Sequence, residues 1–185
     1  MDHAAALSQV EENIARTCKI ARRERGDVHL VAVSKTHPAE VIEPLLEAGQ
    51  RVFGENRVQE ALAKWPELKE ATPELRLHLV GPLQTKKAHD VVRLFDVVET
   101  VDRPKLARAL AAEMDRAGRR PDCFVQVNTG EEPQKAGVTP AETGELVKQV
   151  RENYPGKLLG LMCIPPVDEP AGPHFALLAR LAEEN

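Results

Sequence analysis

Long apolar runs are missing from this sequence of 185 residues. No run approaches the roughly 18–20 residues of a transmembrane helix, and the start MDHAAALSQVEEN lacks the apolar core of a signal peptide. We therefore expect a cytoplasmic protein with no membrane partner. Neither sign of charge is in large excess, because 25 basic and 29 acidic residues give a net charge of -4. This balance gives no indication of a nucleic-acid partner.

Cysteine is also scarce. The three cysteines, Cys18, Cys123 and Cys163, are widely spaced and odd in number. In a chain without a secretory signal they are predicted to be free thiols in a reducing cytosol. The ligand spacings of zinc sites are absent, so no metal site is predicted.

Short apolar runs alternate with helical patterns along the chain. The runs are rich in Val, Leu and Ile, which favours strands of a buried parallel sheet. They cover residues 28–34, 51–54, 76–81, 96–101, 123–128 and 158–164. Helical segments of roughly 10–16 residues separate them, which is the pattern of βα units. The sequence therefore predicts an α/β fold with right-handed crossovers.

Two common folds are built from such units. A doubly wound sheet would carry a glycine-rich phosphate turn after its first strand, but Val33-Ser34-Lys35-Thr36-His37-Pro38 has no glycine. Barrels place their function at the carboxyl ends of the strands, where the distinctive residues of this chain fall. We predict one TIM-type (β/α)8 barrel domain over residues 1–185, with about six of its eight strands present.

The ends of several helices can also be predicted. An amphipathic helix is expected at about residues 3–25, before the first strand. Asp102 is expected to cap the helix that Gly118 ends, and Thr139 with Glu142 forms a capping box. Pro44 lies inside a helical pattern, so that helix should be kinked or should begin later.

Lys35 is the first candidate for chemistry. It ends an apolar strand, and burial of its stem at a barrel mouth would favour the neutral amine. A neutral amine is the form that makes a Schiff base with an aldehyde. The alternative is a lysine that extends to solvent from a strand end, and position alone favours that alternative.

Two further residues are candidates for binding a ligand. Asn56 follows Gly54 after the second strand, where glycine permits close approach of backbone to a ligand; the alternative is a helix N-cap. His78 lies within the third strand, where the alternative is a hydrogen-bonded core histidine. Lys86 and Lys87 after that strand are interpreted as a solvated helix face.

Six motifs recur together in one known family. In order they are VAVSKTHP, FGENRVQE, HLVGPLQTKK, VVETVDRPKLA, VQVNTGEEPQKAGV and GLMCIPP. With them, the chain from about residue 7 to 185 resembles the pyridoxal phosphate homeostasis proteins. These are barrels similar to the amino-terminal domain of bacterial alanine racemase. The resemblance implies that Lys35 holds pyridoxal 5'-phosphate as a Schiff base and that Asn56 lies near the cofactor.

The resemblance implies a carrier and regulator of the cofactor with little or no catalysis, which supplies pyridoxal-phosphate-dependent apoenzymes. One alternative is a racemase-like pyridoxal-phosphate enzyme, and another is a barrel fragment that binds nothing. Efficient two-base racemisation needs an acid/base on each face of the cofactor. The sole tyrosine, Tyr154, precedes the sixth strand and is expected at the wrong edge of the sheet.

The sequence departs from the family pattern near its carboxyl end. Members continue, after the helix that matches residues 174–185, with two strands that supply most of the phosphate cradle. Neither of these two strands follows Glu183-Glu184-Asn185 here, so we expect a barrel that is incomplete at this end. The phosphate-binding residues are expected in that absent segment.

Overall fold

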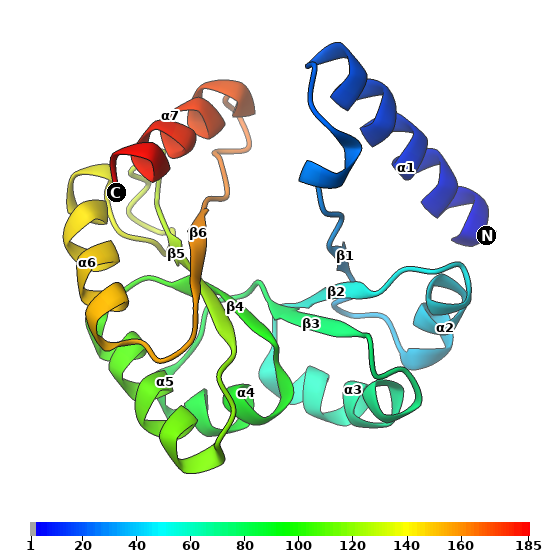
Figure 1. The fold of residues 1–185 in the computed structure, drawn as a ribbon, viewed down its shortest axis with the longest axis horizontal. Helices are drawn as coiled ribbons and strands as arrows, with labels where there is room; N and C mark the ends of the chain where they lie inside the picture. Colours follow the sequence, from blue (N-terminus) through cyan, green and yellow to red (C-terminus); the bar gives the residue numbers. More distant parts are fainter. Residues whose placement is uncertain (1–2) are drawn as a thin grey trace.

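In the computed structural model, which describes residues 3–185, six parallel strands form one sheet in sequence order (Figure 1). They are β1 (Ala32–Val33), β2 (Val52–Glu55), β3 (Arg76–Leu79), β4 (Val97–Val101), β5 (Asp122–Gln126) and β6 (Leu158–Met162). Each strand pairs in parallel with the next. A doubly wound sheet would reverse its strand order at a switch point, so this order confirms the predicted barrel type.

Helices lie before, between and after the strands and surround the outside of the curved sheet (Figure 1). They are α1 (His3–Ile20), α2 (Ala39–Glu47), α3 (Val58–Ala71), α4 (Ala88–Leu94), α5 (Pro104–Ala117), α6 (Thr143–Asn153) and α7 (Ala171–Glu184). Three short 3-10 helices, η1 (Arg25–Asp27), η2 (Thr85–Lys87) and η3 (Pro140–Glu142), lie in the connections. No helix within residues 3–185 is both long and apolar enough to cross a membrane.

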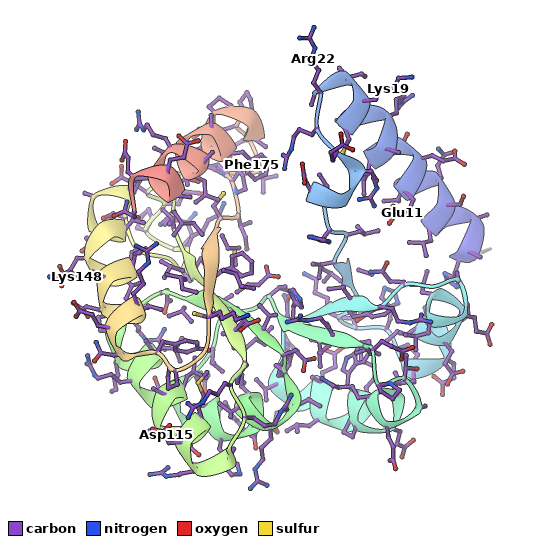
Figure 2. The ribbon with its side chains drawn as sticks, viewed as in Figure 1. Glu11, Lys19, Arg22, Asp115, Lys148 and Phe175 are labelled. Atoms are coloured by element: carbon purple, nitrogen blue, oxygen red, sulfur yellow. The ribbon has the colours of Figure 1, made fainter. Side chains whose placement is uncertain are left out.

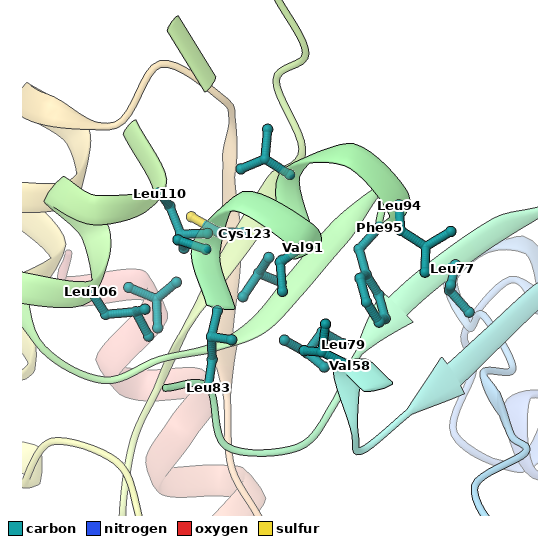
Figure 3. Packing of buried hydrophobic residues seen from close by; sticks show 14 of the residues in the cluster. Val58, Leu77, Leu79, Leu83, Val91, Leu94, Phe95, Leu106, Leu110 and Cys123 are labelled. Carbon is teal, nitrogen blue, oxygen red and sulfur yellow. The ribbon is translucent and has the colours of Figure 1, made fainter. Parts of the chain in front are cut away.

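The hydrophobic core lies between the sheet and the helices (Figure 3). Leu77 and Leu79 of β3 are fully buried there, and Phe53 of β2 packs on Trp65 of α3 with ring centroids 5.1 Å apart. Burial of each such side chain contributes about 1.5–3 kcal/mol to stability. Because side chains alternate along a strand, the residues between these point to the other face, here called the inner face.

The inner face carries polar groups, although the strand runs predict apolar residues on both faces. His78 lies between Leu77 and Leu79 and contacts Glu99 of β4, and both are partly buried. The first strand is also shorter than predicted, because β1 contains only two residues and pairs with β2 alone. It forms one end of the sheet.

The sheet does not close into a ring within the described residues. β1 and β6 are its two ends, and each has a hydrogen-bonded strand on one side only. Leu159 of β6 is 47% exposed, and Phe175 of α7 lies toward the opening between the two ends (Figure 2). The prediction of six strands is confirmed, and closure of such a barrel takes eight.

Several predicted helix ends need correction. Arg103, not Asp102, is the N-cap of α5, because Pro104 takes the first helical position and Asp102 pairs with Arg103 instead. Gly118 ends that helix in the left-handed conformation, as predicted. The helix that contains Pro44 does not begin later, since it starts at Ala39 directly after Pro38.

The predicted capping box and the predicted first helix both form. The capping box of Thr139 and Glu142 is confirmed, although it begins η3 rather than α6 directly. The first helix forms where predicted but ends at Ile20, five residues early. Arg22 follows with a positive φ of 54°, which is incompatible with a continuing right-handed helix.

Candidate functional site

Lys35 lies in the turn that follows β1, at the carboxyl edge of the sheet. Its side chain is exposed, which matches the alternative of a lysine that extends to solvent and not the buried stem. The reason is the shortness of β1, which ends at Val33 and leaves Lys35 beyond the strand. The amine is therefore accessible to a ligand at the edge where barrels carry their function.

Three valines, two of which shortly precede Lys35 in the chain, form an apolar floor. Val31 and Val33 approach Val80 of the loop after β3 across Gly54. A Cβ on Gly54 would stand 3.2–3.3 Å from a methyl group of each valine, which is tighter than ordinary contact. Gly54 thus lets the three valines converge into a floor suited to a flat, uncharged ring.

Below the Lys35 turn is a buried charged pair that the motifs did not single out. Glu55, the last residue of β2, is fully buried and lies 2.7 Å from the ammonium nitrogen of Lys64 on α3. Ser34 donates a hydrogen bond to the same carboxylate oxygen at 2.7 Å. An apolar strand that ends in glutamate, followed by a lysine nine residues on, is the only hint of this pair in the sequence.

Asn56 lies at the same edge, on the loop between β2 and α3. It is partly buried and helps line a cavity of about 460 Å³, together with Gln84 and Lys87. It is not the N-cap of α3, because Arg57 takes that position. The loop after β3 passes so close to Asn56 that a Cβ on Gly81 would stand 2.6 Å from the Asn56 Cα.

His78 lies deeper on the inner face than Lys35 and Asn56. Its Nδ1 is 2.7 Å from Oε1 of Glu99, and its register partner on β2 is Gly54. Gly54 is also the residue beneath the valine floor, so His78 sits next to the floor rather than at the mouth. The alternative of a hydrogen-bonded interior histidine therefore describes the geometry of His78 in this structure.

A smaller cavity of about 180 Å³ lies farther along the same edge. It is lined by the last residue of β5 and by seven residues of the segments after β3, β5 and β6: Gln126, Val80, Pro82, Val127, Asn128, Lys135, Ala136 and Ile164. Val80 belongs both to this cavity and to the valine floor. The carboxyl edge thus combines an accessible amine, an apolar floor and amide groups.

Metal ligands do not gather at this edge or elsewhere in the described part of the chain. Among residues 3–185, no group of three His, Cys, Asp or Glu side chains could hold a metal ion. Cys18, Cys123 and Cys163 are free thiols, as predicted.

Comparison with known families addresses the whole fold. The profile described as "Alanine racemase, N-terminal domain" matches residues 6–183. The chain belongs to the alanine racemase N-terminal domain family. Within this family it is 38% identical to the pyridoxal phosphate homeostasis protein of Pasteurella multocida over 165 residues, which covers 88% of this chain and 70% of that protein. The Aquifex aeolicus protein of the same name is 36% identical over 187 residues, covering 100% of this chain and 81% of that protein.

Solved structures are also similar to this chain in fold. PipY of Synechococcus elongatus, determined with pyridoxal phosphate bound, is 38% identical with a TM-score of 0.78, covering 92% of this chain and 80% of that chain. An alanine racemase of Clostridium difficile is 14% identical with a TM-score of 0.70, covering 95% of this chain and 47% of that chain. The second likeness supports the fold alone, and the predicted family resemblance is confirmed.

Proposed function

We propose that this chain binds pyridoxal 5'-phosphate through Lys35 and acts in intracellular homeostasis of the cofactor, as a carrier with little or no catalysis. The observation that carries the proposal is the exposed Lys35 at the carboxyl edge, two residues after Val33, which forms the floor with Val31 and Val80. PipY, a relative of 38% identity, has been determined with pyridoxal phosphate bound. The curated relatives are named for homeostasis of this cofactor and not for a reaction.

The residues at the edge fit the chemistry of the group. A neutral lysine amine adds to the aldehyde carbon, and water leaves as the C=O bond is replaced by C=N. This condensation needs no oxidant or reductant, and water reverses it, as a carrier requires. The valine floor would cover one face of the pyridine ring, and the Asn56 amide can both donate and accept hydrogen bonds beside it.

We propose that His78 also lies near the bound cofactor, but farther from the carboxyl edge than Lys35 and Asn56. It is partly buried and paired with Glu99, but it borders the floor through Gly54. The proposed recipients of the cofactor are pyridoxal-phosphate-dependent apoenzymes.

The decisive experiment is reduction of the loaded protein with borohydride, followed by peptide mass mapping. We expect the pyridoxyl adduct on Lys35. Lys35→Ala should abolish this adduct while changing the free energy of unfolding by about 0.5 kcal/mol or less, because the side chain is exposed. Lys86→Ala, which removes another exposed lysine, is the matched control and should leave the adduct unchanged. Labelling mainly at Lys86 or Lys87 would overturn the assignment.

A further inference from the structure

The pair of Glu55 and Lys64 is more deeply buried than the other ion pairs of the described chain. The side chain of Glu55 is 0% exposed and that of Lys64 is 6% exposed. Removing two charges from water costs several kcal/mol per ion unless further hydrogen bonds satisfy them. The partners of this pair therefore indicate what it holds together.

Those partners belong to the turn that carries Lys35. The Lys64 ammonium donates to the backbone carbonyl of Ser34 at 3.0 Å and to that of His37 at 2.8 Å. One cation thus ties the backbone on both sides of Lys35. Lys64 reaches this turn from α3, across the end of β2.

The carboxylate holds the same turn from the other side. Oε1 of Glu55 accepts hydrogen bonds from the Ser34 hydroxyl at 2.7 Å and from the indole nitrogen of Trp65 at 3.0 Å. The Ser34 amide also donates to the Gly54 carbonyl at 3.0 Å. Ser34 is therefore fixed through its amide, its carbonyl and its side chain, directly before Lys35.

Thr36, directly after Lys35, is held in an unfavourable conformation. Its φ is +66°, in the left-handed region that β-branched residues rarely adopt. Its amide donates to the carboxylate of Glu60, which lies 3.6 Å from the Lys64 ammonium. Such a conformation costs of order 1–3 kcal/mol and persists only where the surroundings impose it.

We propose that Lys64 and Glu55 are positioning residues for the Lys35 amine. The inference rests on the proposed function and deepens it. Ser34 is fixed by the buried pair, and Thr36 by Glu60, which is partly exposed and lies beside Lys64, while the side chain of Lys35 projects into solvent. The Lys35 amine must approach the aldehyde carbon from a defined direction. Because the backbone around Lys35 is fixed, the amine can reach that direction through the rotamers of the Lys35 side chain alone.

The test is a double substitution, Glu55→Gln with Lys64→Met. Lys64→Met alone would leave a buried unpaired carboxylate, whereas the double variant removes both charges. The glutamine oxygen can still accept from Ser34 and Trp65, but the bonds to the Ser34 and His37 carbonyls are lost. The matched control is Lys69→Met, which removes a cation of the same helix that pairs with Asp96 at the opposite edge of the sheet.

The measured quantity is the ratio of pyridoxyl adduct on Lys35 to adduct on Lys86, after borohydride reduction well below the unfolding temperature of each variant. Because this ratio compares two lysines of one folded molecule, a general loss of stability does not lower it.

We expect the double variant to lower the ratio about tenfold and Lys69→Met to leave it unchanged. Equal ratios in the double variant and the control would overturn the inference. Absence of an adduct on Lys35 in the unsubstituted protein would instead overturn the proposed function.

Discussion

The Tyr154 hydroxyl donates a hydrogen bond to the Pro121 carbonyl at 3.0 Å. Pro121 directly precedes β5, and Tyr154 precedes β6, so this bond lies at the amino edge of the sheet, opposite Lys35. Tyr154 is buried, and desolvation raises its pKa well above the usual range of a phenol. The sole tyrosine of the chain is therefore neither placed nor poised to act as an acid/base on a ligand at Lys35.

From this placement we expect alanine racemisation to be absent or orders of magnitude below that of a dedicated racemase. Tyr154→Phe should leave the adduct on Lys35 unchanged and lower the free energy of unfolding by about 1 kcal/mol, because one buried hydrogen bond is lost. Formation of D-alanine from L-alanine and denaturant unfolding measure the two effects. Robust racemisation that disappears in Lys35→Ala would support the racemase-like alternative instead.

The strand order could be predicted because each strand is a short apolar run and each ends in a distinctive loop. The runs that begin at Arg76 and Asp96 give strands of four and five residues at the expected places. Helix caps were harder to predict, because the choice between Asp102 and Arg103 depends on one residue of register. Pro104 decides that register, because it occupies the first helical position after Arg103. If Asp102 were the N-cap, Pro104 would be the second helical residue and would have no amide hydrogen for the Asp102 side chain to accept.

At the site, the sequence located Lys35, Asn56 and His78 at the carboxyl half of the sheet but not what supports them. Lys64 lies on a helix and Glu55 ends a strand, so either alone is interpreted as a surface charge. Their contact joins residues nine positions apart through the packing of α3 on β2, which no local pattern encodes. The sequence left the burial of the Lys35 stem open for a similar reason, since it depends on where β1 ends, and β1 contains only two residues.

Gly81 offers a test of how closely the two loops at the site are fitted. A Cβ at this position would lie 2.6 Å from the Asn56 Cα and closer still to its carbonyl oxygen, so backbone must move. We expect Gly81→Ala to cost roughly 1–3 kcal/mol of stability. Displacement of Asn56 should also weaken pyridoxal phosphate binding about tenfold.

Gly172→Ala is the control for this substitution, because a Cβ there meets nothing within 4 Å. Gly172 lies in α7, where alanine is favoured over glycine by up to about 1 kcal/mol. Its thermal midpoint should stay the same or rise, and its cofactor affinity should be unchanged. Unaltered affinity and stability in Gly81→Ala would contradict the close approach of the two loops.

The cysteines should differ in their reaction with alkylating reagents. Cys123 is fully buried, and desolvation raises its pKa to about 12, so very little thiolate exists at neutral or mildly alkaline pH. Desolvation also raises the pKa of Cys163, which is only partly buried. At about pH 8 we expect mass spectrometry to find Cys163 labelled well before Cys123, and faster labelling of Cys163 as the pH increases. Denaturant should abolish the difference, and equal rates in the folded protein would contradict it.

The two ends of the sheet lead to the last prediction. In the described chain β6 has a strand on one side only, and Leu159 on it is 47% exposed. An edge with unpaired backbone groups and apolar side chains is a template for pairing with another chain. We therefore expect residues 1–185 to associate as concentration rises, measured by size-exclusion chromatography with light scattering.

Leu159→Lys should shift the distribution toward monomer, because the charge cannot be buried between paired edges. Leu62→Lys, on the outer helix α3, should not. A monomer at all concentrations, or equal effects of the two lysines, would show that this edge does not drive association.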